Sequence, residues 1–382
     1  MTDFFDIIIC GAGPAGSTCA LALESSGLRV ALIDKQGFPR DKICGDAVAP
    51  YVPNVLNTIH PKYKAAFDAF KEKELVTTLR VVAPNQKNID LNFPKGGAIS
   101  MRMHLDHFLF EQAEKLANVT TFIGAAVSSV QTTPEKASIT LKDGQVLEGK
   151  IVVGCDGAQG LVAKQLTNNM IDLKHNSAAV RAYYKNVKGI PDQTFELHYL
   201  EDLMPGYFWI FPLPDGFANV GLGMVSQAIR DKKVNLRKEL TRIIEETPYL
   251  KERFEGAELV DAPKGFGLPL GSRKVTISGE RFMLCGDAAS LIDPLSGEGI
   301  GQAMISGRYA GWQAKACFEQ QDFSAKMMKA YDKMVYDKLW REHRLHYFTQ
   351  RAIANRPWLI NGFANIALKN SFIMRLFQRA FW

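Results

Sequence analysis

The stretch Asp6 to Gly16, DIIICGAGPAG, decides the fold. Its first part, Asp6 to Cys10, is a short apolar run typical of a buried parallel strand, and a helical pattern continues after the glycines to about Ser26. A second apolar run, Val30 to Ile33, predicts the next strand and is followed directly by Asp34. Strand, glycine-rich turn, helix, strand and acid thus follow in the order of a dinucleotide-binding βαβ unit, the alternative being a turn used only for packing.

The turn of this unit predicts a separate role for each of its three glycines. Gly11 makes the tight turn, Gly13 lets the backbone approach a pyrophosphate, and Gly16 lets the helix pack closely on the strand. Free amides at the helix start can then meet phosphate charge, and Asp34 can accept hydrogen bonds from an adenosine ribose. The predicted cofactor contacts of this unit are Gly11, Gly13, Ala15, Gly16, Asp34 and Lys35.

Length and composition favour two interleaved domains. The chain has 382 residues, 47% of them hydrophobic, which is ordinary for a protein with a large core. Its six cysteines show no C-x-x-C spacing, so we expect no disulfide scaffold, no metal site and a cytoplasmic location. No uninterrupted apolar segment approaches the roughly 20 residues of a membrane span, so we expect any membrane contact to be peripheral.

A second glycine-rich segment, far along the chain, predicts the other end of the nucleotide site. Arg281 to Ala289 has the pattern of a strand that ends in Gly-Asp, and the loop Gly297 to Gly301 opens a helix. No acid follows at the distance that a second βαβ unit needs, so the segment indicates the far end of one long cofactor. The predicted contacts here are Gly286, Asp287, Pro294, Gly297, Gly299, Ile300 and Gly301.

The motifs CDGAQG at Cys155 to Gly160, CGDAA and PLSGEGIGQA, taken with the N-terminal turn, resemble the flavoprotein fold of the para-hydroxybenzoate hydroxylase type. The resemblance implies an α/β protein with a Rossmann-like FAD-binding domain, an interleaved antiparallel-sheet substrate domain and C-terminal helices. It also implies that Asp287 binds the ribityl chain of FAD and that Gly297 to Gly301 lie under the flavin pyrimidine. A helix N-terminus there can stabilise the negative charge of a reduced flavin.

Arg102 and Asp106 stand in the place of an R-x-x-x-D element of these flavoproteins. The resemblance implies that Arg102 contacts the flavin or its phosphates. The alternative is a surface ion pair with Asp106.

The DG element departs from the family pattern D-G-x-x-S-x-x-R. Asp156 and Gly157 are present as predicted cofactor contacts, but Gly160 replaces the usual Ser and Ala163 the usual Arg. In the family hydroxylases this element serves both FAD and NADPH. The electron donor therefore stays open between NAD(P)H, ferredoxin and a separate reductase.

The alternating aromatic residues Tyr207, Trp209 and Phe211, followed by Pro212, share one face of a predicted strand. They resemble the Y-x-W-x-F-P motif of geranylgeranyl reductases, which saturate isolated carbon–carbon double bonds of prenyl chains. KICGD at Lys42 to Asp46 is close to the K-x-C-G-G of that family, and PLSGEGI resembles a loop of the same family. The resemblance implies an FAD-dependent reductase of a prenyl or other long unsaturated lipid, with the three rings binding substrate; the alternative is a face that packs the core.

Alkene reduction needs a hydride from flavin N5 at one carbon and a proton at the other, and so an acid or water near the flavin. The resemblance places Cys44 beside the flavin as that acid and as a cofactor contact, the alternative being a buried, inert thiol. Asp46, where the family has glycine, is either a proton source or a support for the loop. Tyr207 is the third predicted catalytic residue, because a pure core position would not favour its hydroxyl.

Two other functions fit parts of this pattern. A flavin-dependent monooxygenase or halogenase would use the aromatic pocket for an aromatic substrate, but halogenases carry W-x-W-x-I-P, where this chain has Tyr207 and Phe211. A non-catalytic flavoprotein would sense redox state or carry electrons, and would tolerate replacement of the aromatic residues.

The expected domains are an FAD-binding domain from residues 1–74, 100–170 and 272–325, a substrate domain from 75–99 and 171–271, and a C-terminal helical region from 326–382. From His343 to Trp382 the chain has six Lys or Arg and no acid, mixed with aromatic residues. This composition suits peripheral contact with the inner membrane surface, the alternative being helices that cap the core. The basic residues accompany no nucleic-acid motif, so the expected partners are a lipid substrate and an electron-donor protein, not nucleic acid.

Overall fold

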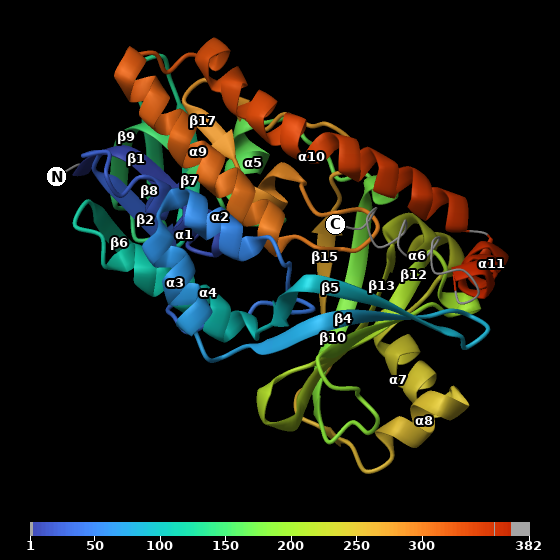
Figure 1. Ribbon diagram of the computed structural model, residues 1–382. Helices are drawn as coiled ribbons and strands as arrows, with labels where there is room; N and C mark the ends of the chain where they lie inside the picture. Colours follow the sequence, from blue (N-terminus) through green and yellow to red (C-terminus); the bar gives the residue numbers. More distant parts are fainter. Residues whose placement is uncertain (1–2, 355, 368–382) are drawn as a thin grey trace.

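The computed structural model describes residues 3–354 and 356–367, and these residues form two β-sheets with helices packed around them (Figure 1). The first sheet contains β1 (Asp3–Cys10), β2 (Val30–Asp34), β6 (Val119–Ile123), β7 (Val127–Thr132), β8 (Ala137–Leu141), β9 (Val146–Gly154), β16 (Ser278–Gly279) and β17 (Phe282–Leu284). Its main order is β16-β17-β9-β1-β2-β6, and β7 and β8 extend it from β9. The central strands β2, β1, β9 and β17 run parallel, as a dinucleotide-binding sheet requires.

The predicted βαβ unit is confirmed, with one difference at the end of its helix. β1 pairs in parallel with β2, and α1 (Pro14–Ala22) joins them. The helix ends at Ala22, earlier than the expected end near Ser26, because the next residues form tight turns with hydrogen bonds from each amide to the carbonyl three residues before. A Cβ on Gly16 would lie 1.8 Å from the carbonyl oxygen of Gly11, so this glycine allows α1 to pack directly on the turn.

The second sheet contains β3 (Ala47–Val48), β4 (Glu74–Val82), β5 (Asn88–Ile99), β10 (Asn176–Lys185), β11 (Thr194–His198), β12 (Gly206–Pro212), β13 (Phe217–Val225), β14 (Glu258–Leu259) and β15 (Lys264–Pro269). The expectation of an antiparallel sheet is wrong for one pair, since β4 and β11 run parallel. The chain leaves this sheet after β5 and passes through the first sheet before it returns, so no hairpin fixes the direction of β11. The domain boundaries given above remain our proposal.

Helices cover both sheets. They are α2 (Val52–Ile59), α3 (Pro61–Ala69), α4 (Arg102–Glu114), α5 (Leu161–Leu166), α6 (Ser226–Lys232), α7 (Leu236–Glu246), α8 (Pro248–Phe254), α9 (Ile300–Gln320), α10 (Ala325–Ile353) and α11 (Pro357–Ala367). Figure 1 shows α10 as a long helix that runs from the first sheet toward α11 beside the second. Among the described residues, none of the helices combines the length and the apolar character that crossing a membrane would require.

The two faces of β12 have different neighbours, as the period of two along a strand predicts. Phe208 and Ile210 belong to a buried cluster with residues of α7 and α8. Trp209 and Phe211 belong to a separate cluster on the opposite face, which includes Ile360 of α11. This second face is the one that positions the functional site.

The expected C-terminal helical region is helical from Ala325 to Ile353 and from Pro357 to Ala367. The basic and aromatic residues after this point lie outside the described residues; they are Lys369, Phe372, Arg375, Phe377, Arg379, Phe381 and Trp382.

Candidate functional site

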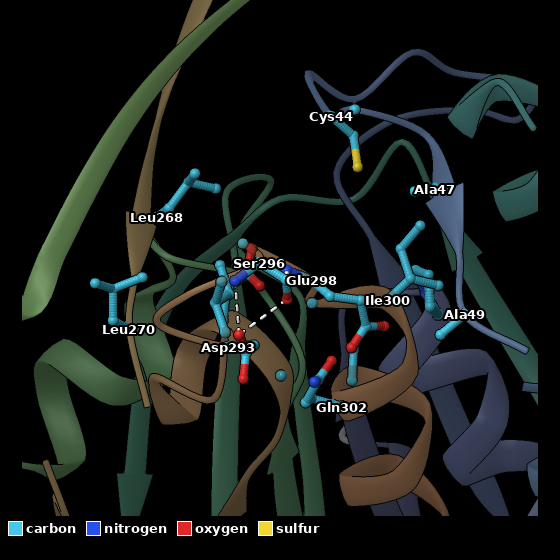
Figure 2. A pocket seen from close by; sticks show the side chains of 18 of the residues that line it. Cys44, Ala47, Ala49, Leu268, Leu270, Asp293, Ser296, Glu298, Ile300 and Gln302 are labelled. Carbon is cyan, nitrogen blue, oxygen red and sulfur yellow. Dashed lines mark hydrogen bonds between the residues drawn. The ribbon is translucent and has the colours of Figure 1, made fainter. Parts of the chain in front are cut away.

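One cavity of about 1730 Å³ is lined by residues of both sheets and of α9, α10 and α11 (Figure 2). Small-molecule sites usually measure roughly 300 to 1,000 Å³, so this volume can hold a large cofactor together with a second ligand. All of the predicted cofactor contacts line it except Gly16 and Gly301. These two glycines instead allow close packing, since a Cβ on Gly301 would lie 2.3 Å from the hydroxyl oxygen of Tyr51.

The nucleotide end of the cavity is formed by the turn between β1 and α1. Gly13 is the N-cap of α1 and supplies no side-chain hydrogen bond, so the first amides of the helix are left for a ligand. The carboxylate of Asp34 accepts hydrogen bonds from the amides of Ala12 (3.0 Å) and Gln36 (3.0 Å), and forms an ion pair with Arg40 (3.2 Å). These three donors fix the carboxylate at the edge of the cavity.

The far end of the cofactor region is formed by the loop before α9. Gly299 is the N-cap of this helix and, like Gly13, supplies no side-chain hydrogen bond. Gly297 has a φ of +72°, which favours glycine, and a Cβ there would lie 2.9 Å from the hydroxyl oxygen of Tyr207. The carboxylate of Asp287 forms an ion pair with Lys42 at 2.9 Å. The starts of α1 and α9 therefore face one cavity, and in the first turn of α9 the Glu298 carboxylate accepts a hydrogen bond from the Gly301 amide at 2.7 Å.

Several buried polar atoms that border the cavity have no hydrogen-bond partner within the described part of the chain. They are Asp46 Oδ1, Asp156 Oδ1, Gln302 Oε1 and the Nε atoms of Arg40, Arg181 and Arg308. Unpaired buried polar atoms are rare in proteins, and a ligand commonly satisfies them. Together with the two helix starts, they fit a long polar cofactor that carries phosphate groups.

The unusual Gly160 in the DG element has a direct structural reason. Asp156 accepts a hydrogen bond from the amide of Val162 at 3.0 Å, near the start of α5. A Cβ on Gly160 would lie 2.2 Å from Asp156 Oδ1. The usual Ser would therefore collide with the carboxylate in this arrangement.

Arg102 does not form the surface ion pair that we considered as an alternative. It is buried at the start of α4, with 4% of its surface exposed, and its guanidinium binds both oxygens of Asp106 at 2.6 and 2.9 Å. Burial opposes its charge, but Asp106 and the neighbouring Cys44 raise the pKa of Arg102 above its ordinary value. The side chain also lines the cavity, so a permanent positive charge lies beside Cys44.

The aromatic residues of β12 line the cavity and also pack within the buried cluster on their face of the sheet. Tyr207, Trp209 and Phe211 all border it, and consecutive rings lie about 6 Å apart, with centroid distances of 6.1 and 6.0 Å. The hydroxyl of Tyr207 donates a hydrogen bond to the carbonyl of Ser296 at 2.5 Å. The indole of Trp209 donates one to Asn219 at 2.9 Å.

Asp46 is the centre of a buried network beneath the Cys44 loop. Its Oδ2 accepts hydrogen bonds from Tyr183 (2.8 Å) and Asn219 (2.7 Å), and Asn219 also donates to the carbonyl of Cys44 (2.8 Å). Asp46 has a φ of +67°, a conformation that glycine adopts easily, which explains why the family pattern has glycine here. Burial raises the pKa of Asp46 to about 7, although the hydrogen bonds from Asn219 and Tyr183 oppose the shift.

Cys44 lies where it can act on a bound ligand. It borders the cavity, and Figure 2 shows it across the pocket from Asp293 and Ser296. Burial raises the pKa of its thiol, while the charge of Arg102 opposes the shift. The group is therefore a protonated thiol at neutral pH, able to donate a proton but weak as a nucleophile.

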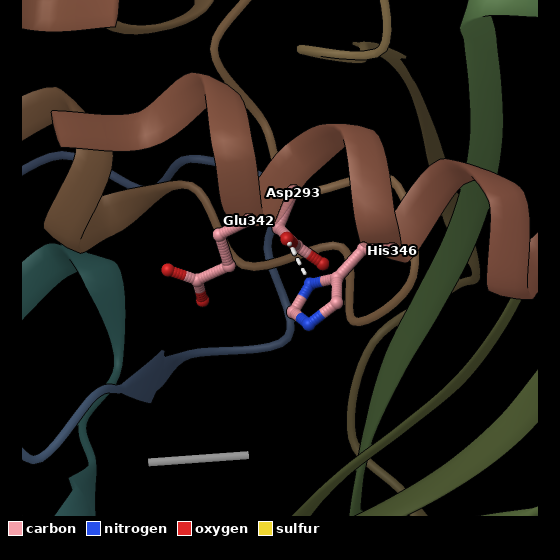
Figure 3. A group of neighbouring side chains, drawn as sticks. All are labelled: Asp293, Glu342 and His346. Carbon is pink, nitrogen blue, oxygen red and sulfur yellow. Dashed lines mark hydrogen bonds and ion pairs between the residues drawn. The ribbon is translucent and has the colours of Figure 1, made fainter. Parts of the chain in front are cut away.

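The sequence analysis missed a second group of titratable residues at this cavity. Asp293, Glu342 and His346 all border it, and one side-chain nitrogen or oxygen atom from each residue lies within 4.8 Å of those of the other two (Figure 3). A weak signal was available, because Glu342 and His346 stand four residues apart on one helix face. No feature of the sequence pairs that face with Asp293.

Comparisons with known proteins agree with this geometry. A model of the FAD binding domain matches residues 5–189, and a model of the geranylgeranyl reductase catalytic domain matches residues 176–264. The second match contains the aromatic strand β12.

Similar proteins extend over nearly the whole chain. Digeranylgeranylglycerophospholipid reductase of Thermoplasma volcanium is 29% identical and covers 92% of this chain and 88% of its own. Menaquinone reductase of Mycobacterium tuberculosis H37Rv is also 29% identical and covers 81% of this chain and 76% of its own.

Solved structures share the fold. A geranylgeranyl bacteriochlorophyll reductase-like protein from Thermoplasma acidophilum superposes with a TM-score of 0.84 at 24% identity, covering 96% of this chain and 92% of the other. The halogenase PltM, with FAD and phloroglucinol bound, gives a TM-score of 0.78 at only 15% identity, covering 98% and 85%. At these identities the likeness establishes the fold alone.

The two domain matches meet at the cavity, where the first supplies the nucleotide end and the second the aromatic wall. A cavity of this size and lining fits FAD together with a second ligand. The chain is an FAD-dependent oxidoreductase that is similar to geranylgeranyl reductases.

Proposed function

We propose that this protein reduces carbon–carbon double bonds of a prenyl or other long unsaturated lipid. The observation that carries the proposal is the continuity of one cavity from the two helix starts, past Cys44, to the aromatic face of β12. Bound FAD, once reduced, supplies a hydride from its N5 atom. Relatives named as reductases of digeranylgeranylglycerophospholipid and of menaquinone support a lipid substrate.

The part of the cavity beyond the aromatic residues is apolar. Its walls come from β4, β5 and β11, and α11 adds to them; the residues include Val76, Leu79, Val81, Ile89, Leu91, Phe93, Phe195, Leu197, Ile360 and Phe363. An isolated alkene offers no polar group, so its binding energy must come from buried apolar area, at roughly 25 cal/mol per Å². These walls supply that area next to the Cys44 loop.

Within this proposal Cys44 donates the proton that the second alkene carbon needs. Its thiol is protonated at neutral pH, and the thiolate that remains after transfer is stabilised by the guanidinium of Arg102. Asp46 holds the loop through Tyr183 and Asn219, and its pKa near 7 also lets it return a proton. Tyr207 positions the aromatic wall against the loop before α9.

We also propose peripheral contact with the inner membrane surface through α10 and α11. Leu345, Phe348, Trp358 and Ile366 expose 60, 55, 64 and 52% of their surfaces, and no acid occurs from His343 onward. The opposite face of α11 borders the cavity. A helix with apolar groups on both sides suits an interface between a lipid bilayer and a lipid-binding cavity. The electron donor, whether NAD(P)H, ferredoxin or a separate reductase, is not specified by this arrangement.

The proposal is tested without oxygen. The bound flavin is photoreduced and mixed with a geranylgeranyl lipid in detergent, and the return of oxidised-flavin absorbance is followed while mass spectrometry counts the added hydrogens. We expect reoxidation with gain of two hydrogens per double bond, and no reaction with the saturated lipid. No reaction with either lipid, together with a long-lived intermediate when oxygen is admitted, would favour hydroxylation or halogenation of an aromatic substrate instead.

A further inference from the structure

We propose that His346, held by Asp293, is a second proton-donating residue of this cavity, an inference that rests on the double-bond reduction proposed above. His346 lies on α10 and Asp293 on the loop before α9, so the pair joins two elements at the cavity wall. It is distinct from Cys44, which belongs to the loop after β2.

The carboxylate of Asp293 is fixed from both sides. Its Oδ2 accepts a hydrogen bond from His346 Nδ1 at 2.6 Å (Figure 3). Its Oδ1 accepts hydrogen bonds from the amides of Leu295 (3.0 Å) and Ser296 (2.8 Å) and from the Ser296 hydroxyl (2.9 Å). A buried carboxylate with this many donors stays ionised, and its charge orients the imidazole and stabilises the protonated ring.

The pair lies beside the predicted reaction centre. Ser296, which Asp293 holds, offers the carbonyl that accepts the hydrogen bond of Tyr207. The same loop continues into Gly297 and Gly299, the predicted flavin contacts. Cys44 lies across the pocket from Asp293 in Figure 2, so Cys44 and Asp293 belong to different walls of the cavity.

Electrostatics favour the charged form of His346. Burial opposes protonation, but the hydrogen bond and charge of Asp293, followed by the charge of Glu342, raise the pKa of His346 above its ordinary value. The other titratable neighbour on α10 is His343, whose pKa burial lowers, so it adds little positive charge at neutral pH. On the loop before α9, burial raises the pKa of Glu298 to about 7, and the charge of Asp293 adds to this shift.

This makes His346 a better matched acid than Cys44. General acid catalysis is most efficient when the pKa of the donor lies near the working pH. Burial moves the thiol pKa further above neutrality, whereas the imidazole pKa is raised from an ordinary value of about 6.5. Asp293 therefore favours the protonated imidazole, which is the form that can donate a proton.

Glu342 links the pair to solvent. Its side chain is exposed, and one of its carboxylate oxygens lies within 4.8 Å of a carboxylate oxygen of Asp293 and of an imidazole nitrogen of His346. A proton taken from water can therefore reach the imidazole without crossing the apolar part of the cavity.

The step balances as follows for a double bond that is protonated by His346 rather than by Cys44. The π bond breaks as one carbon receives a hydride, with its electron pair, from the reduced flavin, and the other receives a proton from the second N–H of His346, on Nε2. The flavin ends oxidised, the alkene gains two C–H bonds, and the neutral imidazole takes a proton from water by way of Glu342.

The first test measures the pair without any turnover. The ring signals of His346 are identified by their loss in His346→Gln, and their titration is followed by NMR in the FAD-bound protein. We expect a pKa above the ordinary value of about 6.5 in the unchanged protein and a lower one in Asp293→Asn and in Glu342→Gln. The Glu342→Gln variant, on an exposed side chain, gives the answer even where Asp293→Asn disturbs the loop. A pKa at or below the ordinary value would overturn the proposal.

The second test measures single-turnover lipid reduction against pH. We expect the unchanged protein to lose rate at alkaline pH, His346→Gln to be slower by a factor of about 100 to 10,000 and to lack this limb, and Cys44→Ala to keep it. His107→Gln is the matched control, because His107 also pairs with a carboxylate on its own helix, Glu111 at 3.3 Å, but does not border the cavity. Full rate and an unchanged pH profile in His346→Gln would refute the role. If the unchanged protein reduces no lipid, the proposed function fails, and the NMR titration still reports on the pair.

Discussion

The hydroxyl of Tyr207 donates a hydrogen bond to the backbone carbonyl of Ser296, 2.5 Å away, and so ties the aromatic strand β12 to the loop that opens α9. One end of this contact belongs to the predicted lipid wall and the other to the predicted flavin loop. This phenol therefore joins the wall that we propose for the lipid to the loop that we propose for the flavin.

Replacement of Tyr207 by Phe keeps the ring and removes this tie. We expect a loss of about 1 kcal/mol in the free energy of unfolding, because one hydrogen bond is lost, and a rise of several-fold in KM for the lipid. Chemical denaturation and steady-state kinetics measure the two effects. Tyr199→Phe is the control, since the Tyr199 ring lies 6.0 Å from that of Tyr207 and borders the same cavity. Equal effects of both changes would contradict a special role for Tyr207.

Replacement of Asp46 by Asn tests the raised pKa of this carboxyl. A pKa raised to about 7 in the folded state means that the folded protein binds the proton more tightly than the unfolded chain. The contribution to stability is complete below about pH 4, the unfolded pKa, and is lost as pH rises to about 7.

We therefore expect the unchanged protein to lose unfolding free energy relative to Asp46→Asn between about pH 4 and pH 7, by a few kcal/mol at most. Denaturant titrations of both proteins at several pH values give the difference. Asn suits the test because it tolerates the left-handed backbone of this position. A difference that is flat with pH would show that Asp46 does not titrate in this range.

Replacement of Cys44 by Ala should slow lipid reduction about 100-fold or more and leave the flavin spectrum unchanged, because a proton donor is removed while the cofactor walls stay in place. Stopped-flow reoxidation of the photoreduced protein measures the rate. Cys317→Ala is the control, as this cysteine is fully buried in α9 and does not border the cavity. Full turnover in Cys44→Ala would remove Cys44 from the mechanism.

Replacement of Gly160 by Ser restores the residue usual in the family pattern. We expect a loss of about 1 to 3 kcal/mol in stability and weaker FAD retention, because the new side chain overlaps Asp156. Thermal unfolding and the flavin content of the purified protein measure both. The same change at Gly37, which like Gly160 has no positive φ but has nothing within 4 Å of its Cβ position, is the control without a collision.

Replacement of Trp358 by Ser should reduce binding to vesicles that contain anionic lipid by about tenfold, because an exposed apolar ring no longer inserts. Vesicle flotation at two salt concentrations measures the bound fraction. Trp312→Ser, on α9 and 36% exposed, is the control. Binding that is unchanged by Trp358→Ser but weakened by Trp312→Ser would move the membrane contact to another face.

Local spacing predicted those parts of the fold and site whose residues are neighbours in the chain. The βαβ unit, the cavity position of Tyr207 and the helix start at Gly299 all follow from short motifs. The burial of Arg102 does not, because its partner Asp106 looks the same on a surface helix and on a buried one.

The pairing of His346 with Asp293 could not be predicted from the sequence either. The two residues are 53 positions apart and belong to elements that only the tertiary fold brings together. The parallel β4–β11 pair was missed for a similar reason. It depends on the route of the chain through the first sheet, and a strand pattern gives no direction for its partner.

The hydrogen bonds of Asn219 have an evolutionary consequence. This one amide serves Trp209, Asp46 and the carbonyl of Cys44, and Tyr183 completes the set. A change of Asp46 to the glycine of the family pattern would leave the Tyr183 hydroxyl and part of the Asn219 amide without their acceptor, at a cost of about 1 to 3 kcal/mol for each buried group. Positions 46, 183 and 219 should therefore change together during divergence, so that relatives with glycine at the first position carry other residues at the remaining two.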